Sequence, residues 1–112
     1  KHPLVDKVYH PALEKSENHN IWKRDFTGSS GLFAFSLKKF YSQTMIRKMF
    51  SKISIFKLGY SWGGYDSLIT FPPLSKRKFK TKINGNLIRV YCGLEDSKDQ
   101  INDIINSLKI LK

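Results

Sequence analysis

The chain has 112 residues, a mass of 13.0 kDa, a formal net charge of +11 and a single cysteine, Cys92. This length predicts one domain, residues 1–112, built around one hydrophobic core. A single cysteine excludes an intrachain disulfide and no apolar run reaches the roughly 20 residues of a membrane span, so we expect a cytoplasmic protein without membrane contacts.

The first half of the chain predicts two strands and two helices. Val5–Tyr9 is typical of a short strand, and residues 18–26 have the length and composition of a short helix. After a Gly/Ser turn at 27–31, the aromatic and aliphatic run Leu32–Leu37 indicates a central strand. Residues 42–53 then predict an amphipathic helix, because apolar side chains recur at helical spacing and basic side chains occupy the other side.

The middle of the chain predicts two strands around a Gly-rich turn. The strands are expected at residues 55–58 and 67–71, with the turn at 60–64 between them. Pro72 and Pro73 end the second strand because proline cannot donate to a strand ladder. A polar connection follows at residues 74–85.

Residues 87–93 predict a strand whose side chains alternate between two environments. One face carries Ile88, Val90 and Cys92, and the other carries Leu87, Arg89 and Tyr91. We expect a final helix that starts at a capping box, residues 97–100, and covers the Ile88 face. Its expected apolar stripe consists of Ile101, Ile104, Ile105 and Leu108.

These elements predict a two-layer α+β sandwich, in which helices cover one face of a mainly antiparallel sheet of four or five strands. Arg89 then points away from the covering helices. A serine, Ser61, and two aromatics, Tyr60 and Trp62, lie on the Gly-Gly turn at residues 63–64. A guanidinium beside such a turn is suited to binding a carboxylate through two hydrogen bonds, which favours an amino acid as ligand.

Two motifs carry a family resemblance that extends from about Val5 to Leu108. The run from Tyr60 to Ile69, YSWGGYDSLI, is similar to the Ser-x-Gly-Gly-x-[Asp/Glu]-Ser-Leu motif of the transsulfuration enzymes of Cys/Met metabolism, which depend on pyridoxal phosphate. Trp62 and the run Arg24-Asp25-Phe26-Thr27-Gly28 resemble the cystathionine β-lyase branch. The resemblance implies the C-terminal, substrate-side domain of a fold-type I enzyme.

The resemblance also implies a role for each site residue. Arg89 would bind the α-carboxylate of the substrate, Ser61 and Trp62 would flank that carboxylate, and Tyr60 would lie at the substrate's far end. The lysine that forms the Schiff base with pyridoxal phosphate belongs to a cofactor domain N-terminal to this segment. Lys82 follows a threonine but lies in a basic loop, so we expect no catalytic residue, no bound cofactor and no activity in residues 1–112 alone.

The implied reaction of the complete enzyme is β-elimination of cystathionine to homocysteine, pyruvate and ammonia, in methionine biosynthesis. The implied partners are the cofactor domain of the same chain, the amino-acid substrate and further copies in a homotetramer. The same fold also serves cystathionine γ-synthases, cystathionine γ-lyases and methionine γ-lyases, which remain alternatives.

A second alternative is a basic module that binds nucleic acid. Residues 36–82 hold 11 of the 20 basic residues and one of the nine acidic ones, and the cluster at residues 76–82 includes an aromatic. Most of the cations are lysines and no nucleic-acid-binding motif accompanies them, which favours a solvated loop and helix face.

Other sites are disfavoured by spacing. Gly59 and Gly64 have Walker A spacing, but Tyr65 and Asp66 stand where that motif needs lysine and a hydroxyl residue. The three histidines lack the spacing of metal ligands, so we expect no metal.

The turn at 27–31 leads into a strand and is favoured as structural. Glu95 and Asp96 precede a helix, where negative charge is stabilising, and do not predict a catalytic pair.

Overall fold

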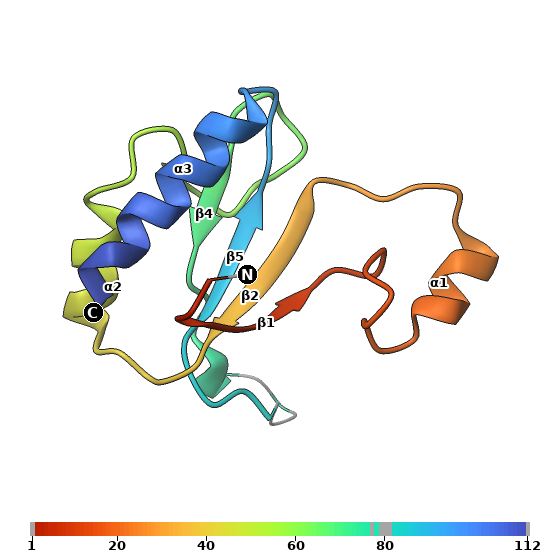
Figure 1. The fold of residues 1–112 in the computed structure, drawn as a ribbon, viewed down its shortest axis with the longest axis horizontal. Coiled ribbons are helices and arrows are strands. Elements are labelled where there is room, and N and C mark those ends of the chain that lie inside the picture. The colour runs from red at the N-terminus through yellow and green to blue at the C-terminus, as the bar shows by residue number, and fades with distance from the viewer. Residues whose placement is uncertain (1, 77, 79–81, 112) are drawn as a thin grey trace.

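The computed structural model describes residues 2–76, 78 and 82–111, and these form five strands and three α-helices (Figure 1). The strands are β1 (Val5–Tyr9), β2 (Leu32–Leu37), β3 (Lys57–Leu58), β4 (Leu68–Thr70) and β5 (Leu87–Tyr91). The helices are α1 (His19–Asp25), α2 (Gln43–Phe50) and α3 (Ser97–Leu108), with short 3-10 turns at Leu74–Lys76 and Lys109–Leu111. No helix in these ranges is long and apolar enough to cross a membrane.

The strands form one sheet in the order β1-β2-β5-β4-β3. Neighbouring strands run antiparallel except β3 and β4, which pair in parallel. Arg89 on β5 lies opposite Ala34 on one side and Thr70 on the other, so its backbone is held by strands on both sides. The predicted α+β architecture with a mainly antiparallel sheet is confirmed.

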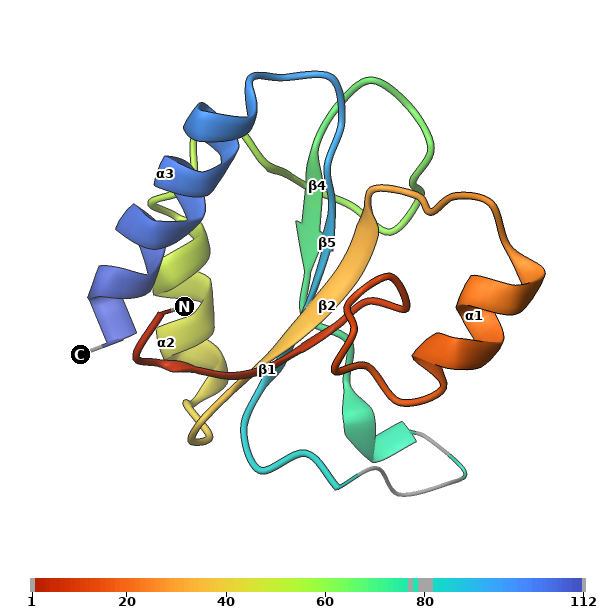
Figure 2. The ribbon, with the colours of Figure 1, turned by 45° about the vertical axis from the view of Figure 1, so that its right-hand side comes forward.

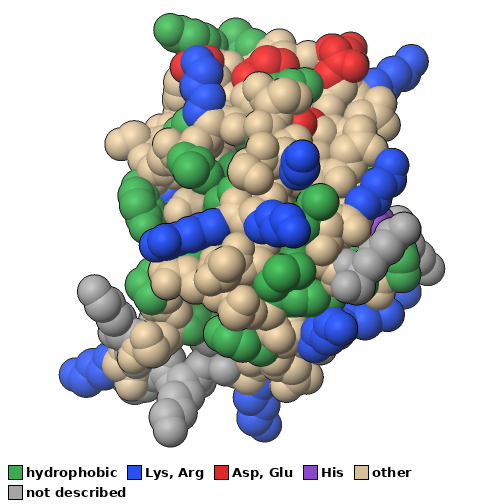
Figure 3. Space-filling view, turned by 90° about the vertical axis from the view of Figure 1, so that its left-hand side faces the viewer, with side chains coloured by type: hydrophobic (Ala, Val, Ile, Leu, Met, Phe, Trp, Pro, Cys, Tyr) green, Lys and Arg blue, Asp and Glu red, His purple; other side chains and the backbone are tan. Residues whose placement is uncertain are grey.

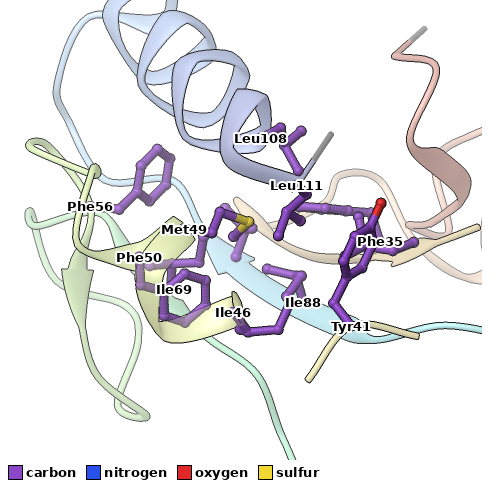
Figure 4. Packing of buried hydrophobic residues seen from close by; sticks show 12 residues of the cluster. Phe35, Tyr41, Ile46, Met49, Phe50, Phe56, Ile69, Ile88, Leu108 and Leu111 are labelled. Carbon is purple, nitrogen blue, oxygen red and sulfur yellow. The ribbon is translucent and has the colours of Figure 1, made fainter. Parts of the chain in front are cut away.

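Helices α2 and α3 cover one face of the sheet, and α1 lies on the other side of it (Figure 2). The predicted alternation of β5 is confirmed at Ile88 and Val90, which are fully buried in the core beneath these helices. Leu87, on the opposite face, is also buried, at 8% exposed. Ile46 and Met49 of α2 are also fully buried there (Figure 4). The core therefore lies on the Ile88 face and leaves the Arg89 face outside it.

Helix α1 buries none of its residues. It is held instead by polar contacts near its ends: His19 Nδ1 lies 2.8 Å from the carbonyl of Pro11, and His10 Nε2 lies 3.2 Å from the carbonyl of Ser30. The carboxylate of Asp25 pairs with Arg24 at 2.7 Å on the exposed surface. This short helix is thus attached to the sheet by its flanking segments.

Helix α3 differs from its predicted orientation and start. Asp96, not Ser97, is the N-cap, since its side chain accepts hydrogen bonds from the backbone N–H groups of Lys98 and Asp99. Leu108 is buried as predicted, but Ile101 is 56% exposed and Ile105 is 38% exposed. The apolar stripe of this helix is therefore only partly directed at the core.

A buried carboxylate explains that orientation. Asp103, 6% exposed, accepts hydrogen bonds from the backbone N–H groups of Ser54, Ile55 and Phe56 at 2.9–3.2 Å, and from the Ser54 hydroxyl at 3.0 Å. Burial raises the pKa of Asp103, but these donors outweigh it and hold the pKa below its usual value. The same bonds keep residues 54–56 out of the sheet, so the predicted strand at 55–58 is reduced to Lys57–Leu58.

The face that carries α2 and α3 has mixed charge (Figure 3). Acidic side chains gather near the start of α3, where Asp96 and Asp99 lie, and basic side chains are spread over the rest of this face. Arg47 and Lys48 of α2 are exposed, as expected for a solvated helix face. The other expected basic feature, the cluster at 76–82, lies largely outside the described residues.

Replacing Tyr41 with phenylalanine is expected to raise the free energy of unfolding by about 1 kcal/mol, because Phe keeps the ring and removes a buried hydroxyl without a partner. Tyr41 is 8% exposed, and its hydroxyl has no hydrogen-bond partner among the described residues (Figure 4). Urea denaturation measures the change. The matched control is Tyr9→Phe, which removes a hydroxyl 3.3 Å from Ser36 Oγ and should lower stability. A Tyr41→Phe variant that is destabilised as much as the control would contradict this prediction.

Candidate functional site

Strand β5 is the base of the candidate site, because its outer face meets the loop that follows β3. We call residues 60–67 the site loop. Arg89 and Tyr91 on β5, and then Gly93 just after the strand, each contact this loop in turn. A central strand is a rigid support, so the side chains that leave it have defined directions.

Arg89 contacts the beginning of the site loop. Its Nη2 group donates a hydrogen bond to the backbone carbonyl of Tyr60, and its guanidinium carbon lies 5.7 Å from the centroid of the Tyr60 ring. The ring is therefore within the range of a cation–π interaction. The structure thus brings together Arg89 and Tyr60, two of the residues selected from the sequence.

Trp62 lies on the same side of the sheet as Arg89. Its ring centroid is 6.1 Å from that of Tyr91, which follows Arg89 by two positions on the strand. The Tyr91 hydroxyl donates a hydrogen bond to the carbonyl of Gly64 at 2.9 Å. Gly63, which lies between Trp62 and Gly64 in the sequence, has a φ of +105°. Glycine adopts this conformation readily, because it has no Cβ to clash with the backbone.

The end of the site loop is fixed by a second network that the sequence did not indicate. Glu95 accepts hydrogen bonds from the backbone N–H and the hydroxyl of Ser67 at 2.9 and 2.7 Å. The Ser67 oxygen in turn accepts from the N–H of Gly93 at 2.8 Å and from Gln100 at 3.0 Å. A Cβ at Gly93 would lie 2.1 Å from the carbonyl oxygen of Tyr65, so the loop lies directly on the end of β5.

The Ser67 donors lower the pKa of the Glu95 carboxyl to about 2. Because the folded-state pKa is below that of an unfolded glutamate, near 4.3, the carboxylate stabilises the fold above that pH. This contribution is lost as the pH falls from about 4 towards 2. Glu95 thus holds the end of the site loop through its bonds to Ser67.

Glu95→Gln is expected to flatten the dependence of unfolding free energy on pH between about 2 and about 5, since the amide has no proton to bind there. Urea denaturation at a series of pH values measures this. Glu14→Gln is a matched control because Glu14 is exposed and has no hydrogen bond to its side chain among the described residues. Equal slopes for Glu95→Gln and the unmodified chain would refute the role of this network.

Three of the predicted site residues present their side chains to solvent. Tyr60 is 67% exposed and Trp62 is 52% exposed, and Ser61 between them is also exposed. Arg89 uses one terminal nitrogen for the Tyr60 carbonyl, which leaves other N–H groups for a ligand. A guanidinium, an indole N–H and aromatic rings, with a hydroxyl on the same loop, are groups that can bind the carboxylate of a small ligand.

Four residues that support the site were not predicted from the sequence: Tyr91, Ser67, Glu95 and Gln100. Only one signal pointed towards Tyr91, because its place two residues after Arg89 put both on the same face. The bonds of Glu95 to Ser67 join residues 28 positions apart, and nothing in either local sequence indicates them.

Comparisons with known proteins give a family match over nearly the whole chain and several relatives. The family model "Cys/Met metabolism PLP-dependent enzyme" matches residues 1–109. Cystathionine beta-lyase MetC of Escherichia coli K12 is 44% identical over 109 residues, which cover 93% of this chain and 28% of that protein. The L-alanine/L-glutamate racemase of Wolbachia pipientis wMel is 39% identical over 109 residues, covering 93% of this chain and 27% of that protein.

A solved structure of cystathionine gamma synthase from Xanthomonas oryzae pv. oryzae, in complex with aminoacrylate and cysteine, superposes with a TM-score of 0.79 at 26% sequence identity. The match covers 97% of this chain and 30% of that one. The chain therefore spans less than a third of the length of the relatives it matches.

Proposed function

Because this chain belongs to the Cys/Met metabolism family of PLP-dependent enzymes, we propose that it is the substrate-side domain of a cystathionine β-lyase. The observation that carries the proposal is Arg89 on a central strand, with its guanidinium against the loop of Tyr60, Ser61 and Trp62. The identity to the Escherichia coli β-lyase supports this choice of reaction.

In this proposal the domain binds and orients the substrate. Arg89 binds the α-carboxylate through its free N–H groups, while Ser61 and the indole N–H of Trp62 offer further donors to the same group. Pyridoxal phosphate, which a further domain would hold, would supply the electron sink for bond cleavage at the substrate's α-carbon. A carboxylate fixed at a rigid strand restricts rotation of the α-carbon and so favours one of its bonds for cleavage.

The proposed complete enzyme cleaves cystathionine to homocysteine, pyruvate and ammonia. Product analysis on the full-length protein tests this, because a γ-lyase instead releases cysteine and 2-oxobutyrate. Release of 2-oxobutyrate as the main keto acid would overturn the β-lyase assignment and keep the family.

A second activity is favoured by one observation, the 39% identity to the L-alanine/L-glutamate racemase. Racemisation also needs a bound amino-acid carboxylate, so the same Arg89 site would serve it. Chiral analysis of L-alanine incubated with the full-length protein separates the two activities. If racemisation is faster than the release of pyruvate from cystathionine, amino-acid racemisation is the main activity.

We further propose that residues 1–112 have no lyase activity alone and that the complete enzyme is a cytoplasmic homotetramer. Mixing this chain with pyridoxal phosphate and cystathionine tests the first point, and release of pyruvate would contradict it. Light scattering coupled to size-exclusion chromatography of the full-length protein tests the oligomeric state.

A further inference from the structure

We propose that Tyr91 is a positioning residue, which holds the segment with Ser61 and Trp62 beside Arg89 and so sets the affinity for the amino-acid substrate. The inference rests on the proposed function for its effect on catalysis. Its structural part, that Tyr91 holds the site loop, does not depend on which reaction the enzyme performs.

The contacts of Tyr91 place it between the strand and the turn. It leaves β5 on the same face as Arg89, with its ring 6.1 Å from that of Trp62 and its hydroxyl 2.9 Å from the carbonyl oxygen of Gly64. The ring therefore lies beside one proposed ligand-binding side chain, and the hydroxyl fixes the backbone two residues further along.

The turn has little else to hold it. A Cβ added to Gly63 or Gly64 would have no atom within 4 Å, so the side of each glycine where a side chain would lie is open. Its side chains project outward, since Ser61 and Trp62 are both exposed. Packing alone therefore does not fix the conformation of residues 61–64.

Hydrogen bonds elsewhere hold the two ends of the site loop. At the start, Arg89 donates to the carbonyl of Tyr60. At the end, the N–H of Leu94 donates to the carbonyl of Tyr65 at 2.8 Å, and Ser67 joins the Glu95 network. Among the described residues, the bond from Tyr91 to Gly64 is the one hydrogen bond made to residues 61–64.

Tyr91→Phe removes this bond and keeps the ring beside Trp62. In the holoenzyme we expect the KM for cystathionine to rise about 3- to 10-fold, the effect of one hydrogen bond, with kcat within about two-fold. The mechanism is a loss of order in the turn, because Ser61 and Trp62 then sample arrangements in which they do not face the bound carboxylate. A purely structural role would instead lower thermal stability without a selective change in KM.

The test combines hydrogen exchange with kinetics on the full-length holoenzyme. The N–H of Ser67 donates to Glu95, so it is the hydrogen-bonded amide that reports opening of the site loop. Amide exchange in peptides that cover residues 60–67 should be faster in Tyr91→Phe than in the unmodified enzyme, without substrate present. Tyr65→Phe is the matched control, since it removes a hydroxyl from a side chain of the same loop that is 73% exposed, and it should change neither quantity. A double-mutant cycle with Trp62→Phe should show that the two effects on KM are not additive.

Each outcome decides the proposal. Faster loop exchange together with a raised KM and non-additivity supports it. Unchanged exchange overturns it, and so does faster exchange with an unchanged KM, or a raised KM that adds independently to that of Trp62→Phe. An unmodified enzyme that does not cleave cystathionine would defeat the proposed function instead, and the exchange measurement would still show whether Tyr91 holds the loop.

Discussion

Arg89→Lys in the full-length enzyme is expected to lower kcat/KM for cystathionine by about 30- to 1000-fold, equal to about 2–4 kcal/mol of transition-state stabilisation. Lysine keeps the positive charge but loses the planar fork that forms two parallel hydrogen bonds with a carboxylate. It also loses the contacts that the guanidinium makes with the carbonyl and the ring of Tyr60. Steady-state kinetics on purified enzyme measures the change.

Stability should change little in the same variant, because Arg89 is directed away from the core that contains Ile88 and Val90. Thermal unfolding of the same preparation checks this. Arg47→Lys provides a matched control, since it makes the same chemical change at an exposed position on α2. Near-normal kcat/KM in Arg89→Lys would exclude the carboxylate role, and loss of activity only through unfolding would make Arg89 a structural residue.

The part of the fold that could be predicted from the sequence is the part determined by local periodicity. Alternation along β5 placed Ile88 in the core and Arg89 outside it, and helical spacing placed Ile46 and Met49 of α2 in the core. These periodic patterns involve residues only a few positions apart, so they can be recognised in a single sequence. The short motif from Tyr60 to Ile69 identified the site loop for the same reason.

The orientation of α3 could not be predicted in this way. Its sequence offers an apolar stripe, but Asp103 on another side of the helix satisfies three backbone N–H groups of residues 54–56. Local hydrophobic periodicity predicts that Asp103 lies on the surface. Its hydrogen-bond partners are about 50 positions away in the sequence, so nothing close to Asp103 indicates that it is buried. The carboxylate therefore competes with Ile101 and Ile105 for the inner side of the helix, and those isoleucines are partly exposed.

The same limit applied to the candidate site. Arg89, Ser61, Trp62 and Tyr60 were indicated by residue type and motif, and the structure brings Arg89 and the loop of the other three together. The contacts that hold this loop in place, from Tyr91 and Glu95, depend on how the loop folds back over β5. Gly93 is an example. The sequence indicates only the end of a strand there, but in the folded chain the loop approaches so closely that there is no room for a Cβ.

Asp103→Asn is expected to lower the free energy of unfolding by about 3 kcal/mol. The amide has nearly the same shape, but its NH₂ group replaces one acceptor oxygen. It then faces either the N–H and hydroxyl of Ser54 or the N–H groups of Ile55 and Phe56. The change leaves donors without partners at a site that is 6% exposed, and it removes a charge that strengthened the remaining bonds.

The pH dependence gives a second readout of the same carboxylate. The pKa of folded Asp103 is held below its usual value, so its contribution is present above the unfolded pKa, near 4, and is lost as the pH falls through the folded pKa. The unmodified chain should therefore lose more stability than Asp103→Asn when the pH is lowered below about 4. Asp99→Asn is the matched control, because Asp99 is an exposed acid in the first turn of the same helix and should cost about 0.3–1 kcal/mol through its interaction with the helix dipole. Urea denaturation of the unmodified chain, Asp103→Asn and Asp99→Asn, at pH 7 and at acidic pH, separates these effects. Equal stability of the two variants at pH 7 would show that the Asp103 bonds do not stabilise the packing of α3 against residues 54–56.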